Sequence, residues 1–162
     1  MAAAKSMDRN KVIELLEYYG EIDGEIKIYR NILEDLTNCY YNPLGAIQCD
    51  GQPKGKYNIS RPTENIVLNI PDGISEEIRN YEKKIADLHN LKTQILQEVS
   101  RLKFKEKSIV FDFYIHGLKW EQVAVHNHYS ERQCKNIRNA AIETLLPRFQ
   151  KNTFILNFDK PA

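Results

Sequence analysis

Two long runs of apolar residues, at alternating steps of three and four, constrain this chain more than any other feature of its sequence. The first run holds nine positions: Val12, Leu15, Tyr19, Ile22, Ile26, Tyr29, Leu33, Leu36 and Tyr40. This spacing lines up side chains along one stripe of an α-helix. Asp8 is a suitable N-cap and Pro43 a suitable end. Gly20 and Gly24 each weaken the interior by about 1 kcal/mol, so the predicted helix needs a packing partner.

The second run follows the same spacing and includes one polar position, Lys92: Ile74, Ile78, Tyr81, Ile85, Leu88, Lys92, Ile95, Val99 and Leu102. Asp72 or Ser75 could cap its start. Residues 42–73, between the two runs, contain four of the six prolines and four of the seven glycines, which predicts an extended connector. Within it, Ile66–Ile70 could form a short strand or pack on a helix.

These patterns predict an all-α protein whose residues 1–102 form a long, coiled-coil-like helical hairpin. Self-association of either helix would satisfy the same pattern. The pattern then shortens over residues 103–150, where we expect three short helices at Glu106–Ile115, Lys119–Asn127 and Ser130–Leu145, the last ending before Pro147. Residues 151–162 form a tail whose apolar side chains are expected to fold back on the core, with a docking segment for a partner as the alternative: Phe154, Ile155, Leu156 and Phe158.

The last two short helices have the features of a helix-turn-helix. Ala124 is a small residue for the helix crossing, and Asn127–Tyr129 can form the turn, with Tyr129 as an apolar plug. Ser130 is the expected N-cap of the following helix, and Gln133 completes the Ser-x-x-Gln pattern of a capping box. This combination predicts a second helix whose first turn can enter the major groove of DNA.

A rotation of 100° per residue separates the two faces of this last helix. The predicted buried stripe is Cys134, Ile137, Ala141 and Leu145, and the side chains predicted to point away from it are Arg132, Asn136, Asn139 and Glu143. Arg, Gln and Asn side chains make bidentate contacts with base edges. We therefore expect Arg132, Gln133 and Asn136 to contact bases. The full predicted DNA-binding set is Lys119, Ser130, Arg132, Gln133, Lys135, Asn136, Arg138 and Asn139.

The distribution of charge supports a polyanion partner for the C-terminal part. The net charge of the chain is only +1. Residues 1–100 hold 12 Lys/Arg against 16 Asp/Glu, whereas residues 101–151 hold 10 against 5, together with three of the four histidines. The basic excess supplies the predicted contacts to the DNA backbone, with Lys119, Lys135 and Arg138 as anchors.

Several other classes find no support in the sequence. No run approaches the roughly 20 apolar residues of a membrane helix, and no secretory leader is present, so we expect a cytoplasmic protein without membrane contact. No phosphate loop or catalytic motif appears, so neither an enzyme nor a cofactor is predicted. His126 and His128, with Cys134, make a poor metal site, and the odd count of three cysteines favours reduced structural thiols.

A resemblance to known proteins adds to this prediction. Gly117-Leu-Lys-Trp-Glu-Gln-Val-Ala124 and Tyr129-Ser-Glu-Arg-Gln133 resemble region 4 of bacterial sigma factors. Over about residues 25–150, the long helices and the connector segment Ile59–Glu64 are similar to ArpU/RinA-type phage regulators of late transcription. The resemblance implies a DNA-binding activator encoded by a phage or prophage and acting in the bacterial cytoplasm. The segment His126–His128 departs from the pattern, because the family usually has acidic or small residues and a glycine near the turn.

Two alternatives to a sequence-specific regulator remain open. One is an oligomeric structural or packaging subunit, similar to a small terminase, in which the helical hairpin assembles and the helix-turn-helix is secondary. The other is a sigma-like mimic that binds a host protein. We expect a homodimer or a higher homo-oligomer formed through residues 12–40 and 74–102, while contact with RNA polymerase is left open by the sequence.

Overall fold

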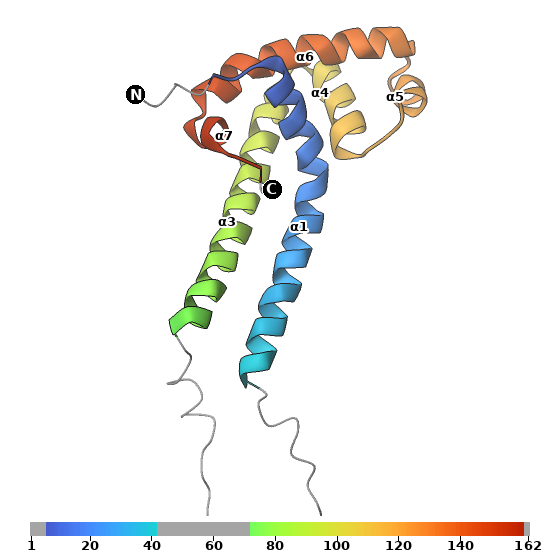
Figure 1. The fold of residues 1–162 in the computed structure, drawn as a ribbon. Coiled ribbons are helices and arrows are strands. Elements are labelled where there is room, and N and C mark those ends of the chain that lie inside the picture. Colours follow the sequence, from blue (N-terminus) through green and yellow to red (C-terminus); the bar gives the residue numbers. More distant parts are fainter. Residues whose placement is uncertain (1–5, 42–71, 161–162) are drawn as a thin grey trace, which may run out of the picture. The chain divides into compact units, whose positions relative to one another are not determined.

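The computed structural model describes residues 6–41 and 72–160, and within these ranges the chain is all-helical (Figure 1). Two long helices come first, α1 (Arg9–Tyr41) and α3 (Asp72–Ser100). They are followed by α4 (Phe104–Val110), a π-helical turn η1 (Phe111–Ile115), α5 (Trp120–Asn127), α6 (Glu131–Lys151) and α7 (Thr153–Asn157). The all-α prediction is confirmed. The predicted Pro- and Gly-rich connector and its segment Ile66–Ile70 lie outside the described residues, except that Asp72 and Gly73 already belong to α3.

The long helices begin and end close to the predicted positions. The Asp8 carboxylate accepts a hydrogen bond from the Lys11 N–H at 2.8 Å, which confirms Asp8 as the N-cap of α1. Helix α3 begins at Asp72, so Ser75 lies inside it, and it ends at Ser100, two residues before the last predicted apolar position, Leu102. Leu102 is nevertheless buried in the turn that leads to α4.

The described chain separates into two compact units, residues 1–25 with 87–162, and residues 26–86. The first unit combines the beginning of α1 and the end of α3 with all the later helices, so it joins residues on both sides of the boundary predicted at residue 102. Its apolar core contains Val12, Leu15, Leu16, Ile22, Leu88, Leu91, Ile95, Val99, Ile142, Leu145, Phe149 and Ile155. Asp23 and Lys92 pair across α1 and α3 at 2.6 Å.

The second unit contains the remaining turns of the two long helices. Within it, the Tyr29 and Tyr81 rings lie 5.7 Å apart between centroids, and the Lys84 ammonium lies over both rings. Most described positions of the predicted apolar runs are only half-buried in this unit, among them Tyr29, Ile78 and Ile85. Ile26, at 4% exposure, is buried.

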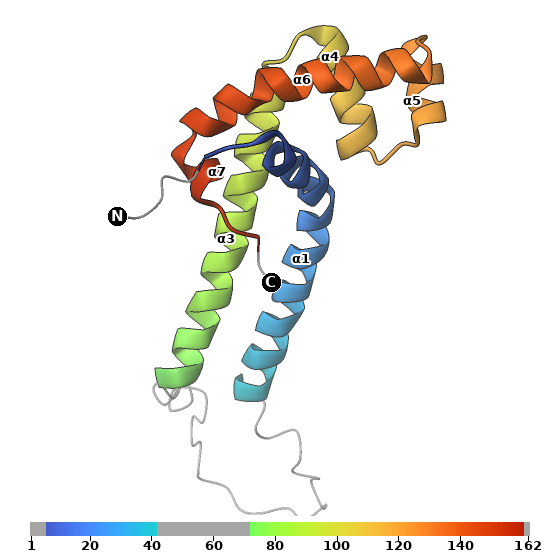
Figure 2. The same ribbon diagram turned by 45° about the horizontal axis from the view of Figure 1, so that its top comes forward.

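Helix α6 differs from the prediction, because it continues through Pro147 to Lys151 (Figure 2). Pro147 removes one backbone donor and so costs one helical hydrogen bond. The following turn is held by the side chain of Phe149, which is fully buried. Burial of a phenylalanine ring stabilises by roughly 1.5–3 kcal/mol, comparable to the cost of the proline. The predicted end of this helix before Pro147 is therefore wrong.

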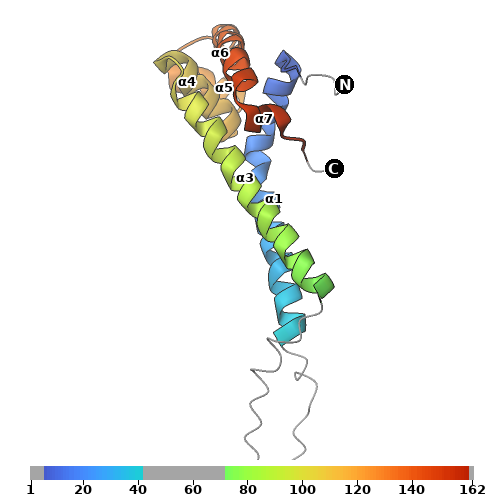
Figure 3. The ribbon, with the colours of Figure 1, turned by 90° about the vertical axis from the view of Figure 1, so that its left-hand side faces the viewer.

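The C-terminal residues fold back on the first unit, as predicted (Figure 3). Asn152 caps α7 by accepting from the N–H groups of Phe154 and Ile155, and Ile155 is fully buried. The Lys11 ammonium donates to the Leu156 carbonyl at 3.1 Å. The Phe158 ring lies 5.9 Å from the Tyr18 ring. The tail thus covers the beginning of α1.

Candidate nucleic-acid interface

Helices α4, α5 and α6 share a small apolar core. Ile109, Val123 and Cys134, one from each helix, are all completely buried. Around them pack Phe113, Leu118, Trp120, Ala124, Tyr129 and Ile137. The predicted stripe of α6 is confirmed in its main part, since Cys134, Ala141 and Leu145 are buried and Ile137 is half-buried. The Cys134 thiol is free, and its pKa is raised by burial and by the charges of Glu131 and Asp112, so it stays neutral. Cys39 and Cys49 lie outside the described side chains.

A short turn joins α5 to α6. His128 has a left-handed backbone conformation, with φ at 57°, and this is the position for which glycine is usual near such a turn. Tyr129 donates its N–H to the Ala124 carbonyl at 3.1 Å, which closes the end of α5. The turn therefore closes without a glycine, with His128 in the left-handed conformation that glycine usually takes.

The beginning of α6 is capped as predicted. The Ser130 hydroxyl accepts a hydrogen bond from the Gln133 N–H at 3.3 Å. The return contact of a full capping box, from the Gln133 side chain to the Ser130 N–H, is not among the contacts of the described residues. Such a contact occurs instead at the start of α5, where the Gln122 amide oxygen accepts from the Lys119 N–H at 3.0 Å. Both helices thus have an ordered first turn.

The first two turns of α6 present polar side chains to solvent. Ser130, Arg132, Gln133, Lys135 and Asn136 are exposed, as is Lys119 at the start of α5. The side chains of Arg132, Gln133 and Asn136 make no hydrogen bond or ion pair with any residue that the structure describes. The Lys135 ammonium lies 3.8 Å from the Glu131 carboxylate and 5.7 Å from the centre of the Trp120 ring.

The remaining two predicted residues, Arg138 and Asn139, are half-buried. One Arg138 nitrogen donates to the Tyr114 hydroxyl at 3.2 Å, and the guanidinium carbon lies 5.4 Å from the centre of the Trp120 ring. Trp120 itself stacks on Phe113, with ring centres 4.0 Å apart. Arg138 therefore holds α6 against η1 and α5 through these contacts.

The position of Asn139 differs from the one that the rotation of an isolated helix predicts. The beginning of α1 reaches this side of α6, where Arg9 lies 3.7 Å from Glu143, one turn beyond Asn139. An angle about the axis of an isolated helix does not include the neighbouring elements that cover part of its surface. The predicted DNA-binding residues that are exposed are therefore Lys119, Ser130, Arg132, Gln133, Lys135 and Asn136.

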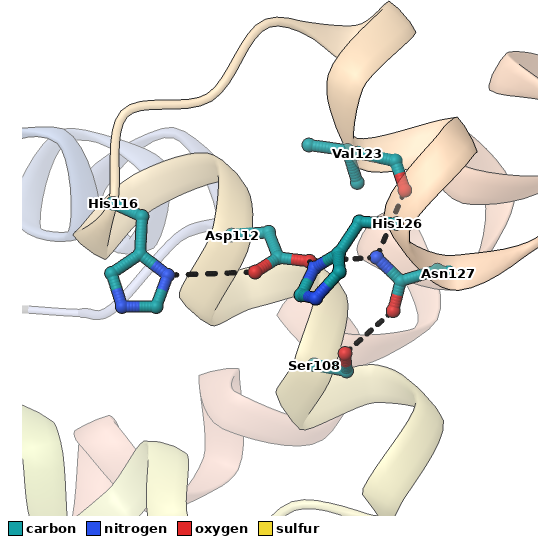
Figure 4. Close-up of polar contacts among 6 residues, drawn as sticks. All are labelled: Ser108, Asp112, His116, Val123, His126 and Asn127. Carbon is teal, nitrogen blue, oxygen red and sulfur yellow. Dashed lines mark hydrogen bonds and ion pairs between the residues drawn. The ribbon is translucent and has the colours of Figure 1, made fainter.

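Sequence reasoning missed a polar cluster around one buried aspartate (Figure 4). Asp112, at 3% exposure, is the only buried charged residue in the described core, and it lies in η1. Its carboxylate contacts His126 Nδ1 at 2.6 Å, the Asn127 amide at 2.7 Å and His116 Nδ1 at 3.4 Å. Asn127 also donates to the Val123 carbonyl at 2.9 Å and accepts from the Ser108 hydroxyl at 2.5 Å. The cluster connects α4, η1 and the end of α5.

The electrostatics of Asp112 follow from this geometry. Burial by itself raises the pKa of Asp112, but the hydrogen bonds from His126, Asn127 and His116 outweigh it and hold the pKa below its ordinary value of 3.8. Asp112 is therefore ionised near neutral pH and accepts hydrogen bonds only. The i, i+4 spacing of Asp112 and His116 is a weak signal in the sequence, whereas nothing there indicates the contact with His126.

The described residues offer little for other chemistry. No group of three or more His, Cys, Asp or Glu side chains within residues 6–41 and 72–160 is arranged to hold a metal ion. None of the described helices is both long enough and apolar enough to span a membrane.

The described part of the chain is thus all-helical and presents an exposed, capped polar helix next to a small apolar core. Residues 7–147 match the family described as "Protein of unknown function (DUF722)", and the chain belongs to that family. No curated protein and no solved structure is similar enough to the chain to give a match.

Proposed function

We propose that the chain is a sequence-specific DNA-binding regulator of transcription that inserts the first two turns of α6 into the major groove of double-stranded DNA. The exposed side chains of Arg132, Gln133 and Asn136 carry this proposal, because they leave their hydrogen-bonding groups free next to a capped helix start. Arginine pairs with guanine edges, and Gln and Asn pair with adenine edges. In this function α5, the turn and α6 act as a helix-turn-helix similar to region 4 of sigma factors.

Contacts to the DNA backbone fit the exposed lysines of the same surface. Lys119 and Lys135 lie at the start of α5 and in the first two turns of α6, where a helix-turn-helix approaches phosphates. Arg138 and Asn139 support the surface from the half-buried side of α6. Arg138 then contributes to DNA binding by fixing the helix, since its guanidinium already contacts Tyr114 and Trp120.

Two copies of the chain would bind one operator. In the unit of residues 26–86, much of the apolar pattern is half-buried and Ile28 is 57% exposed. A coiled-coil-like hairpin with such a face is stabilised by a second copy, and a symmetric dimer is the commonest arrangement. A dimer would also place two α6 helices for half-sites about one turn of DNA apart, or a multiple of it. A phage late-gene activator that works with RNA polymerase is one regulator of this kind.

The experiment is a selection of bound duplexes from a random pool, followed by affinity measurements at physiological salt. We expect one duplex to bind at least about 10³-fold more tightly than random DNA. Arg132→Ala should cost about 1–3 kcal/mol on that duplex and relax the preference at one base pair. Arg79→Ala, which removes an exposed arginine of α3, is the matched control and should leave binding unchanged. Equal affinity for all duplexes would favour the packaging or structural alternative instead.

A further inference from the structure

The exposed histidine that touches Asp112 has a defined chemistry. His126 Nδ1 lies 2.6 Å from the Asp112 carboxylate, while 66% of the His126 side chain is exposed. An ionised carboxylate can only accept a hydrogen bond, so Nδ1 carries the proton. Nε2 is therefore the nitrogen that remains for another partner, and it contacts no polar group of the described residues. In the neutral ring Nε2 is an acceptor, and it becomes a donor only when the ring is protonated.

We infer that His126 is an anion site that accepts a backbone phosphate of the bound nucleic acid through Nε2–H, and that a proton is taken up when the phosphate binds. This inference rests on the proposed function and adds a pH-sensitive contact to it. In the bound state the protonated ring would donate one charge-assisted hydrogen bond to Asp112 and one to the phosphate. His126 lies in the last turn of α5, four residues before the N-cap of α6, and so within the segment that the proposed function assigns to DNA binding.

Both acidic and basic groups lie near the His126 ring. Two carboxylates lie near the ring: Asp112 in η1, 2.6 Å from Nδ1, and Glu121, which borders the same shallow surface depression as His126. His116, directly after η1, contacts the same carboxylate at 3.4 Å and opposes a second positive charge there. The Cys134 thiol in α6 is held neutral and adds no charge. The shorter contact marks His126, rather than His116, as the ring that Asp112 orients.

The test uses the full chain and one non-specific duplex at low salt, with dissociation constants measured from pH 6 to pH 8. Histidine changes its charge between pH 5 and pH 8, and only the protonated ring donates through Nε2, so binding should be about three- to tenfold tighter at pH 6 than at pH 8. His126→Asn places an amide nitrogen where Nδ1 lies and removes Nε2, so it keeps the contact to Asp112 and should lose most of this gain. His128→Asn is the matched control, because asparagine tolerates the left-handed backbone there, and it should keep the gain.

A second measurement separates this inference from the proposed function. The histidine rings are titrated by NMR in inorganic phosphate and in chloride at equal ionic strength. The titration midpoint of His126, but not of His128, should rise in phosphate. If no duplex binds at any pH while this rise is present, the proposed function fails and the anion site stands. If His126→Asn keeps the full pH dependence of duplex binding, or if the midpoint does not move in phosphate, the inference is overturned.

Discussion

The apolar side chains of the α4–α6 core are more completely buried than those of the unit of residues 26–86. Around Ile109, Val123 and Cys134, three helices bury one another's side chains completely. In the unit of residues 26–86, Tyr29, Ile78 and Ile85 keep part of their surface exposed, although the spacing of apolar residues is more regular there. A regular apolar pattern thus predicts helices well, but only the number of packed neighbours decides whether the stripe is covered.

The largest expected effect contrasts one isoleucine in each region. Ile109→Ala leaves a cavity in a closed core and should destabilise the protein by about 2–5 kcal/mol. Ile85→Ala removes side-chain atoms that are already half-exposed and should cost only about 1 kcal/mol in the isolated chain. Denaturant unfolding measures both, with the fluorescence of Trp120, the single tryptophan, reporting the α4–α6 core. Similar losses for the two variants would remove the difference between the regions.

The second prediction concerns the half-exposed face as a contact between copies. Ile85→Asp should raise the dissociation constant of the dimer about 100-fold, because a charge would enter an apolar contact. Ala86→Asp introduces the same charge at the neighbouring exposed position and is the control. Ile26→Asp is less informative, since Ile26 is buried within the chain and its replacement unfolds the helices. Sedimentation at micromolar concentration provides the readout, and an 18.9 kDa monomer of the unaltered chain would contradict the dimer.

The features that could be predicted from the sequence are those set by local patterns. The two long helices, the Asp8 cap, the Ser130 cap and most of the buried stripe of α6 follow from local patterns, in which each residue interacts with others three or four positions away. The same locality explains the wrong end of α6, because the local pattern shows Pro147 but does not show that Phe149, two residues later, is fully buried.

In the candidate site, too, some features could be predicted from the sequence and others could not. The exposure of Arg132, Gln133 and Asn136 was predictable from the helix period. The half-burial of Asn139 was not, since the period of one helix does not show which other elements cover its surface. The contact of His126 with Asp112 joins residues 14 apart through the turn at η1, and no periodic signal reports such a distance. Tertiary contacts of this kind decided which polar residues remain available.

The third prediction tests whether the polar cluster stabilises the α4–α6 core as its apolar residues do. Asp112→Asn removes the charge that His126, Asn127 and His116 contact and should cost about 1–3 kcal/mol at pH 7. The folded state lowers the pKa of Asp112, so its contribution is complete above the ordinary value of 3.8 and is lost as the pH falls further, through the folded pKa. The difference between the two proteins should therefore narrow in acid. A difference that is constant from pH 7 to pH 2.5 would contradict an ionised Asp112.

The smallest expected effects test whether DNA affinity belongs to the α5–α6 surface alone. Lys119→Ala should reduce the slope of log affinity against log salt by about one unit and weaken all duplexes similarly. Lys135→Ala should have a smaller effect, because its ammonium already interacts with Glu131 and Trp120 and gives up those contacts when it meets a phosphate. Lys83→Ala removes an exposed lysine from the half-exposed unit and should leave the slope unchanged. If Lys83→Ala lowers the slope as much as Lys119→Ala does, the phosphate contacts extend over the long helices. DNA binding is then not confined to the α5–α6 surface.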